Sequence, residues 1–459
     1  MKKSWILLML IIFAVSGCIE SRHPATNLWS KGNEATAKGE YSDAVSYHKR
    51  ATELAPQEGL YIFSLCKAYY ANGQYQEAVD ECKKALNHYQ HIPGSVGERD
   101  SRSHMVAAYD KLGQIDSAIS SQKKVVGLLP NDSNAFATLS ILYFKNKQYD
   151  EAITAAKRAI ELKSDNAVAY NNLGAAYRMK KQYNEAFNAF KKAIEIDPAN
   201  ANYRKQMGAL FIDTEDYAKA IEAYKKAVEL QPANIDYILS LANTYRVMGK
   251  YDDAIASVNK AIEMQSIIGA GISISIKDGY TVVIGVMEAG PAKKAEIQVG
   301  DKIIRIDSKS TKGWNLKQVV QSLRGASGTQ VSITIERKGA EKTIDKTVTR
   351  ETIITKEAAL SFGLRSLAYR YKGSLEAALT DAEKAYSLDS ANGWAQLSLG
   401  ASYLDRGKYD ESIKLLSQIK VSLIARILEA TAYAKQGKMK LAVNFYFSIM
   451  DAYPEEAIS

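Results

Sequence analysis

The five histidines and three cysteines of this 459-residue chain are among the residues whose side chains could bind a metal or form covalent bonds. His88, His91 and His104 stand closest together, but no acidic or cysteine ligand accompanies them at the spacing of a metal site. We therefore interpret this stretch as a solvent-exposed loop and expect no metal. The motifs HExxH, GxxxxGK[ST] and GxSxG do not occur, so the sequence indicates a protein that is not an enzyme and needs no cofactor.

The N-terminal segment has the composition of an export signal. Lys2 and Lys3 precede an uninterrupted apolar run over residues 5–15. A run of this length is too short to cross a bilayer as a helix, but it is typical of the apolar region of a signal peptide. The letters VSGC then end at Cys18, so small residues stand directly before the cysteine.

These letters resemble a bacterial lipobox, the motif whose cysteine is acylated and becomes the first residue of the mature protein. The resemblance implies a lipoprotein signal peptide at residues 1–17, a lipidated Cys18 and a short tether at residues 18–24. The residue after Cys18 is Ile19 and not Asp, which suggests that the protein is anchored in the outer membrane and faces the periplasm of a bacterial cell envelope. The alternative is an ordinary secretory signal in which the cysteine occurs by chance.

The charge pattern argues against a nucleic-acid partner. The formal net charge is +9, and it falls to 9 − 2 = +7 without Lys2 and Lys3. Basic residues are scattered among acidic ones, and no basic stripe with interleaved aromatic residues occurs. The composition, 46% hydrophobic and 24% charged, is that of a soluble folded protein. At 459 residues the chain is too long for one compact core, which predicts several modules or an elongated array.

Residues 166–263 repeat with a period of 34 residues. Small residues recur in register at Gly174, Gly208 and Ala242, and aromatic rings recur at Tyr177, Phe211 and Tyr245. Each copy has two stretches of helical periodicity separated by a short polar turn. One such hairpin cannot bury its apolar face alone, so neighbouring copies must stack. The copies resemble the tetratricopeptide repeat, a helix–turn–helix unit of this length. The alternative is an ordinary helical bundle with accidental periodicity.

Each repeat has one small residue near the start of its second helix, and these marker residues give the number of repeats. They are Ala44, Ala78, Ala118, Ala152, Ala186, Ala220, Ala254, Ala378, Ser412 and Ala442. The steps are 34 residues, except for 40 after Ala78, 124 after Ala254 and 30 after Ser412. We predict a mainly α-helical solenoid of about ten repeats, seven in residues 25–266 and three in residues 356–459. Six extra residues fall near 91–96, and the ninth repeat is short by about one helical turn.

Cys66 and Cys82 belong to the second repeat. Cys66 takes the position of the small residue in the first helix, and Cys82 takes the ring position of the second helix. These positions face each other across the hairpin, so an exported protein could join them by a disulfide. The alternative is two small buried side chains that never oxidise.

Between the two arrays the composition changes to that of a β module. Ile272, Ile274 and Ile276 alternate with polar residues, which predicts a strand, and residues 281–286 and 331–336 predict further strands. Leu316, Val320 and Leu323 recur at helical spacing, so we expect them to face inward from a helix.

This segment resembles a PDZ domain, most closely that of bacterial C-terminal processing proteases. The matching letters are GAGI at 269–272, KDG at 277–279, GPAKKA at 290–295, VGDKIIRID at 299–307 and LRG at 323–325. The resemblance implies a small α+β PDZ domain at residues 267–355 that interrupts the solenoid. Glu296 and Ser308 stand where the family has glycine, which questions the geometry of two turns. We expect no Ser/Lys catalytic domain like that of the family after this segment, because the helical pattern returns at residue 356.

The resemblance also implies capture of a peptide C-terminus by strand addition. Its carboxylate loop corresponds to Gly269, Ala270, Gly271 and Ile272, and the peptide would pair with a strand that contains Ser273 and Ile274. The helical spacing then assigns the opposite wall of the groove to Asn315, Val319 and Ser322. The alternative is a domain that only separates the two arrays.

Polar residues on the first helices of the repeats are the candidates for a second binding surface: Asn171, Arg178, Lys205, Asn243 and Arg246. The sequence therefore predicts a scaffold or adaptor of the cell envelope that binds partner helices and unstructured C-termini, and a factor that delivers substrates to a protease is the alternative. An enzyme and a purely structural spacer remain as other classes.

Overall fold

The computed structural model describes residues 24–89, 95–277, 279–287, 290–419 and 422–452. The chain forms two compact units that divide between Asp216 and Tyr217, and each is described by itself. The predicted signal peptide at 1–17, Cys18, the tether up to residue 23 and His91 lie outside the described residues. Within the described parts of the chain, no helix combines the length and apolar character needed to cross a membrane.

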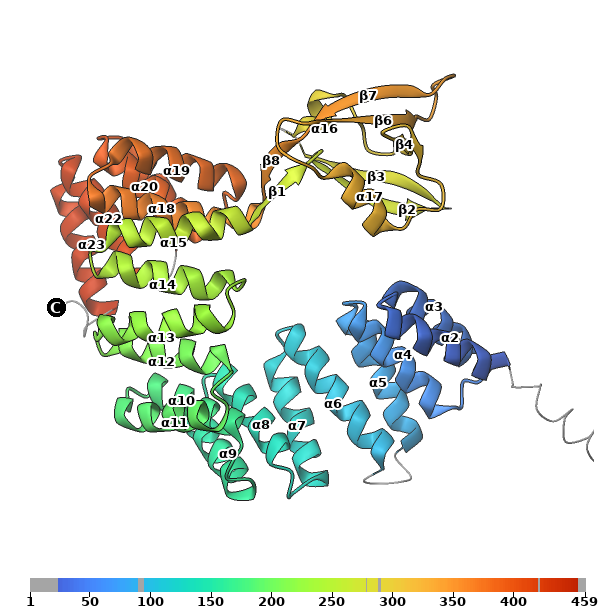
Figure 1. Ribbon diagram of the computed structural model, residues 1–459. Helices are drawn as coiled ribbons and strands as arrows, with labels where there is room; N and C mark the ends of the chain where they lie inside the picture. The colour runs from blue at the N-terminus through green and yellow to red at the C-terminus, as the bar shows by residue number, and fades with distance from the viewer. Residues whose placement is uncertain (1–23, 90–94, 278, 288–289, 420–421, 453–459) are drawn as a thin grey trace, which may run out of the picture. The chain divides into compact units, whose positions relative to one another are not determined.

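The described part of the first unit is helical throughout (Figure 1). Its helices are α2 (Pro24–Lys38), α3 (Tyr41–Leu54), α4 (Gly59–Ala71), α5 (Tyr75–Tyr89), α6 (Val96–Lys111), α7 (Ile115–Leu128), α8 (Ser133–Lys145), α9 (Tyr149–Leu162), α10 (Ala167–Met179), α11 (Tyr183–Ile196) and α12 (Ala201–Asp213).

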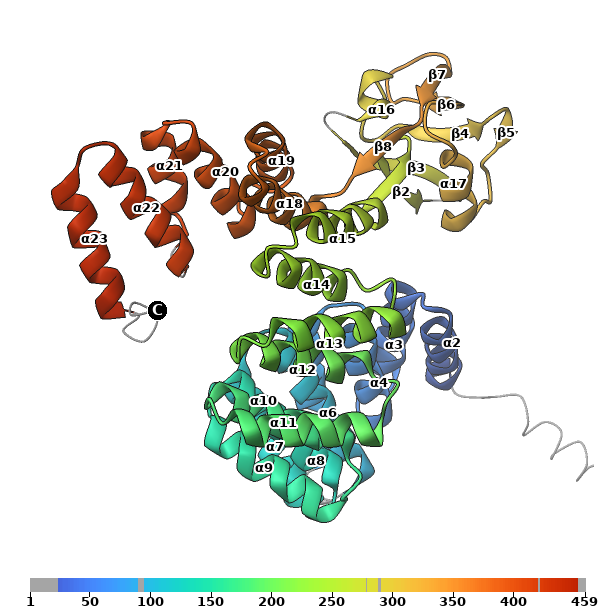
Figure 2. The same ribbon diagram turned by 60° about the vertical axis from the view of Figure 1, so that its left-hand side comes forward.

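The second unit begins with α13 (Tyr217–Leu230), α14 (Ile235–Val247) and α15 (Tyr251–Met264). After the β module it continues with a 3₁₀ turn (Lys356–Ala358), α18 (Ala359–Lys372), α19 (Leu375–Leu388), α20 (Gly393–Asp405), α21 (Tyr409–Leu416), α22 (Leu423–Lys435) and α23 (Met439–Ala452). Figure 2 shows α18 to α23 as three successive helix pairs. Helix α21 has 8 residues where the other second helices have 14 or 15, as the short ninth repeat predicted.

A residue of left-handed conformation ends the first helix of each repeat. These residues are Gly39, Gly73, Gly113, Lys147, Lys181, Glu215, Gly249, Gly373, Gly407 and Gly437. Their numbers advance in the same steps as the marker residues, including the steps of 40, 124 and 30. Positive φ costs least at glycine, which explains the seven glycines. The ten predicted repeats are therefore confirmed.

Inside a repeat, a small residue on the first helix makes room for a larger side chain on the second. A Cβ atom added to Gly32 would lie 2.6 Å from His48, one on Gly174 would lie 2.7 Å from Phe190, and one on Gly400 would lie 2.8 Å from Leu416. Real Cβ atoms essentially never show such distances, so the glycines are required for the helices to approach. The predicted pairing of small and large positions is confirmed in these repeats.

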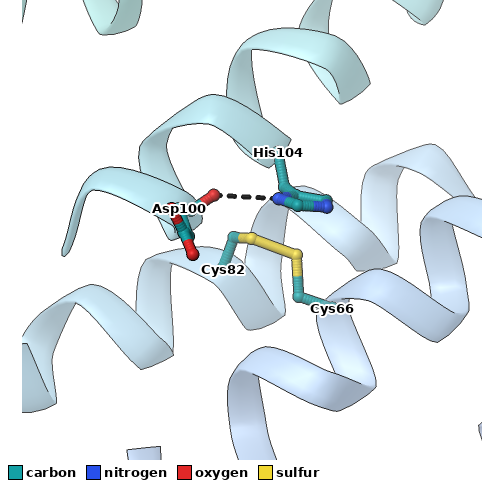
Figure 3. The surroundings of a disulfide bond; sticks show 4 residues. All are labelled: Cys66, Cys82, Asp100 and His104. Carbon is teal, nitrogen blue, oxygen red and sulfur yellow. Dashed lines mark hydrogen bonds between the residues drawn. A yellow bond between two sulfur atoms is a disulfide. The ribbon is translucent and has the colours of Figure 1, made fainter. Parts of the chain in front are cut away.

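Repeat two replaces this pairing by a covalent bond. Cys66 of α4 and Cys82 of α5 form a disulfide, with their Cα atoms 5.3 Å apart (Figure 3). The predicted bond is therefore present in the structure. His104 of α6 lies beside it, with its Nδ1 at 2.9 Å from the backbone oxygen of Asp100 and its ring edge-on to Phe63.

We expect reduction of this disulfide to lower the free energy of unfolding of the first unit by about 3 kcal/mol, because the bond restricts the unfolded chain by closing a loop of about 16 residues. Urea denaturation with and without a thiol reductant measures the difference. A Cys66→Ala/Cys82→Ala variant is the control, since its unfolding should not respond to the reductant. Identical curves for the unmodified chain would contradict the expectation.

His48 occupies the ring position of the first repeat and is 1% exposed. Its Nδ1 has no hydrogen-bond partner among the described residues. Burial, with a smaller contribution from Lys67, lowers the pKa of His48 from 6.5 to about 4. The imidazole is therefore neutral in the folded unit at neutral pH. Because the unfolded state binds a proton first as the pH falls, His48 contributes stability above pH 6.5 that is lost as the pH falls towards 4.

We accordingly expect the first unit to lose about 2 kcal/mol of its free energy of unfolding between pH 7 and pH 5 through this residue. Denaturant titrations at both pH values measure the loss. The matched variant His48→Met cannot titrate at this position, so it should show a smaller dependence on pH. An equal dependence in both proteins would assign the effect to other groups.

The β module lies between the two arrays without separating the repeats that flank it. Helix α18 packs on α15, and their shared core includes Ile262 and Phe362. Gln265 Nε2 donates to the backbone oxygen of Glu357, and its Oε1 accepts from Ser361. The chain therefore leaves and re-enters the array at adjacent points.

The module consists of a two-stranded ribbon and a larger sheet. The ribbon pairs β1 (Ser266–Gly269) with β8 (Glu351–Ile354). The sheet has the order β2-β3-β4-β6-β7, with β5 beside β4. Its strands are β2 (Ile272–Lys277), β3 (Tyr280–Val286), β4 (Lys302–Ile306), β5 (Lys309–Ser310), β6 (Gln330–Glu336) and β7 (Ile344–Thr349), and its helices are α16 (Pro291–Lys294) and α17 (Leu316–Leu323).

The turns at Glu296 and Ser308, where the PDZ family has glycine, keep the backbone geometry that glycine would favour. Glu296 has φ +58° and Ser308 has φ +65°, so both adopt the left-handed conformation despite their side chains. The departures from the family pattern therefore leave the strand connections intact.

Candidate functional site

The edge of β2 is the structural basis of the candidate site. In the described residues β2 pairs with β3 alone, from Ile272 opposite Val286 to Lys277 opposite Tyr280. The other edge of β2 faces α17 (Figure 1). An edge strand presents unpaired backbone groups to which an extended peptide can add.

A pocket of about 520 Å³ lies at the start of this edge. All six loop and strand residues predicted for peptide binding line it: Gly269, Ala270, Gly271, Ile272, Ser273 and Ile274. The other lining residues come from β3 and the residue after it (Gly285, Val286, Met287), from α17 and its C-cap (Val320, Leu323, Arg324) and from the ribbon with the residue that follows it (Ile267, Ile353, Thr355).

Backbone hydrogen bonds hold the loop before β2 in place. The N–H of Ala292 donates to the oxygen of Ala270 at 2.8 Å, and the N–H of Met287 donates to the oxygen of Gly271 at 3.0 Å. Gly271 has φ +74°, and a Cβ atom on it would lie 3.1 Å from Cδ of Pro291. The loop therefore needs glycine at this position both for its conformation and for its close approach to α16.

The predicted helical wall of the groove was wrong in detail. Val319 is wholly buried in the core of the module, and Leu316, which was expected inward, is 47% exposed. Asn315 caps α17: its Oδ1 accepts from the N–H of Gln318, while its own N–H donates to Oε1 of Gln318. Ser322 does not line the pocket either, and its backbone oxygen accepts from Arg350. The residues of α17 that face the groove are Val320 and Leu323.

Helical spacing alone could not resolve this rotation. Leu316, Val320 and Leu323 form one apolar stripe of this 8-residue helix, and Val319 forms another with Leu323. Successive residues differ by about 100° around the helix axis, so the two stripes point in different directions. Arg350 helps to fix the choice, because its guanidinium donates to the backbone oxygens of Leu323 and Ser322 and to that of Gln330. A Cβ atom on Gly325 would lie 2.9 Å from Arg350 Nε, so glycine leaves room for this clamp.

Arg324 is the one charged residue that lines the pocket, among the described residues. It is exposed, and its side chain has no hydrogen bond or ion pair with the described residues. Among the described residues, no carboxylate side chain lines the pocket. The described lining is therefore apolar with one positive charge at its border, which suits an apolar group next to an anion.

The polar candidates on the first helices are engaged with neighbouring helices to different degrees. Arg178 of α10 pairs with Asp213 of α12 at 2.6 Å. Arg246 of α14 donates to Oδ1 of Asn243 and lies over the ring of Tyr371 in α18, 5.6 Å from its centroid. Burial lowers the pKa of Arg246.

The remaining two candidates differ in their surroundings. Asn171 is 8% exposed, and its Oδ1 has no partner among the described residues. Lys205 of α12 is half-buried. The structure therefore assigns Arg178 and Arg246 to contacts between successive repeats, while Asn171 keeps a polar atom without a partner.

A ladder of ion pairs between successive repeats was missed in the sequence. Lys145 pairs with Asp110, and Arg370 pairs with Asp405, each at 2.6 Å and 35 residues apart, in the same way as Arg178 and Asp213. The signal was available, because a basic residue and an acidic residue recur at one repeat length plus one.

Family models agree with the two kinds of module. A PDZ domain model matches residues 282–337. Tetratricopeptide repeat models match residues 30–94, 131–199 and 211–265. The chain is a tetratricopeptide-repeat protein that carries a PDZ domain. The third repeat lies between the matches at 30–94 and 131–199. In this repeat Val106 takes the small position and Gln122 the ring position. Gln122 Nε2 donates a hydrogen bond to the backbone oxygen of Ala135.

Relatives of this tetratricopeptide-repeat protein include proteases. The carboxy-terminal processing protease CtpA of Bacillus subtilis is 36% identical over 88 residues, which are 19% of this chain and 19% of that protein. The carboxy-terminal-processing protease of Bartonella bacilliformis is 30% identical over 134 residues, which are 28% of this chain and 31% of that protein. The chain thus spans less than a third of the length of these curated relatives.

Solved structures similar to the tetratricopeptide-repeat protein include a tetratricopeptide repeat protein from Parabacteroides merdae. It has 17% sequence identity and a TM-score of 0.46, and the similarity covers 52% of this chain and 93% of that one. Another is YrrB, described as a tetratricopeptide-repeat protein with an unusual peptide-binding site, at 19% identity and a TM-score of 0.32 over 40% of this chain and 92% of that one.

Proposed function

We propose that this protein is a non-enzymatic scaffold of the bacterial cell envelope. Its PDZ domain binds the unstructured C-termini of partner proteins, and its repeats bind partner helices. The observation that carries the proposal is the edge of β2, which has no strand partner among the described residues, beside an apolar pocket whose one charged lining residue in the described chain is Arg324. An extended peptide gains backbone hydrogen bonds from the strand edge, and its terminal side chain and carboxylate match the pocket.

Calorimetry tests the PDZ part of this proposal. The chain from residue 19 is titrated with peptides of about eight residues that end in an apolar residue, each with a free or an amidated C-terminus. We expect a dissociation constant near 1 μM for the free terminus and much weaker binding of the amide. Equal binding of both forms, or of neither, would contradict recognition of a C-terminus.

A second candidate function is delivery of substrates to a protease. It is favoured by the 36% identity to a carboxy-terminal processing protease over 88 residues. In this role the PDZ groove holds a substrate tail while a separate enzyme cuts it. Affinity capture of the native protein with mass spectrometry distinguishes the two roles, since a protease would be recovered only for the second. A peptidase assay of the purified chain checks that it is not itself an enzyme.

The membrane anchor is also a proposal, because Cys18 lies outside the described residues. It is supported by the apolar run at residues 5–15 and the letters VSGC before residue 19. Acyl chains on Cys18 would hold the protein at the outer membrane, facing the periplasm. Labelling with an alkynyl fatty acid tests this: the label and the membrane fraction should both be lost in Cys18→Ser, and their retention would refute the anchor.

A further inference from the structure

The peptide groove of the PDZ domain continues beyond the carboxylate loop onto the β1–β8 ribbon. Ile267 of β1 and Ile353 of β8 line the same pocket as Gly271, Ile272 and Ile274. Ile267 is 40% exposed and Ile353 is half-buried, so both offer apolar surface to a ligand. Thr355, directly after the ribbon, also lines the pocket.

The two isoleucines act as one surface because they are cross-strand partners. In the ribbon register Ile267 lies opposite Ile353, so their side chains are on the same face. Ile268 and Thr352 form the next pair and point to the opposite face. Ile268 is 37% exposed but does not line the pocket.

The end of the ribbon next to the sheet is held in a fixed position relative to the groove. Glu351, the first residue of β8, accepts from Nζ of Lys294 at 2.7 Å. Arg350, directly before β8, is buried, and it joins the C-terminus of α17 to Thr329 and Gln330. The apolar face of Ile267 and Ile353 is therefore present before a peptide binds.

We propose that Ile267 and Ile353 determine the size of the terminal side chain that this site accepts. The occupant is a peptide with a free carboxylate and a large apolar last residue, such as phenylalanine or leucine. The carboxylate is matched by Arg324, the one charged lining residue of the described pocket, and the last side chain rests on the ribbon. This inference rests on the proposed function of the groove and adds a contribution from outside the sheet and α17.

The experiment compares three peptides that differ only in the last residue, Phe, Leu or Ala, by calorimetry with the chain from residue 19. The unmodified protein should bind the Phe and Leu peptides about tenfold or more tightly than the Ala peptide. In the double variant Ile267→Ala/Ile353→Ala this preference should fall to within about twofold, while the affinity for the Ala peptide stays the same. Ile268→Ala, on the opposite face, is the matched control and should keep the full preference.

Each other result has a distinct meaning. A double variant that keeps the tenfold preference would overturn the inference and assign selectivity to Ile272, Ile274 and Val320, with the proposed function intact. A double variant that loses affinity for all three peptides equally would also overturn it. No binding by the unmodified protein would overturn the proposed function and this inference together. Thermal unfolding of each variant shows that the PDZ domain is folded.

Discussion

Replacing Gly271 by tryptophan should abolish peptide binding by the PDZ domain. The new side chain would start 3.1 Å from Pro291 at a residue with φ +74°, next to the pocket. The dissociation constant should rise from about 1 μM to beyond about 1 mM, which is about 4 kcal/mol. Calorimetry with a peptide ending in a free apolar residue measures this change.

The control for this variant is Gly279→Trp. Gly279 precedes β3 with φ +75°, has nothing within 4 Å of its added Cβ atom and does not line the pocket. It therefore reproduces the backbone strain of the first variant without obstructing the groove, and it should bind the peptide normally. If both variants lose binding equally, strain in the domain explains the loss, and the loop before β2 has no special role.

The variant Phe190→Ala should lower the free energy of unfolding of the first unit by about 3 to 5 kcal/mol. Phe190 is wholly buried against Gly174, so truncation removes its burial and leaves a cavity between α10 and α11. Denaturant unfolding of the chain from residue 19 measures the change.

A double-mutant cycle makes this prediction specific to the glycine pair. Gly174→Ala alone places a methyl group 2.7 Å from the Phe190 ring and should cost about 1 to 3 kcal/mol by overpacking. In Gly174→Ala/Phe190→Ala the methyl group has space, so the double variant should be more stable than the sum of the single changes predicts. Strict additivity would show that the two positions are not matched in size.

Much of the fold was predictable because it depends on the spacing of residue types within one repeat. The repeat length, the six extra residues and the short α21 follow from counting small residues, and the left-handed turn residues repeat the same steps. Cys66 and Cys82 were paired because the repeat register already placed the two positions opposite each other. The carboxylate loop was predictable because glycines are required where the backbone turns at Gly271.

The rest of the site depends on contacts between segments that are distant in sequence. Val319 and Val320 are adjacent valines, and only packing against the sheet and the hydrogen bonds of Arg350 decide which one faces the core. The contribution of Ile353 to the pocket depends on its pairing with Ile267, 86 residues earlier in the chain. Periodicity within one element contains no information about such pairs.

The insertion between α15 and α18 also affects the order in which this part of the protein folds. Helix α15 ends at Met264 and α18 begins at Ala359, so 94 residues separate the two helices. Contacts between segments this far apart in sequence form slowly, because the long loop between them must first be closed. The PDZ domain can complete its own core within that loop, and the pairing of β1 with β8 brings the two ends of the insertion together. Until then Ile262 and its apolar neighbours have no α18 to cover them, so a folding intermediate would expose an open repeat end.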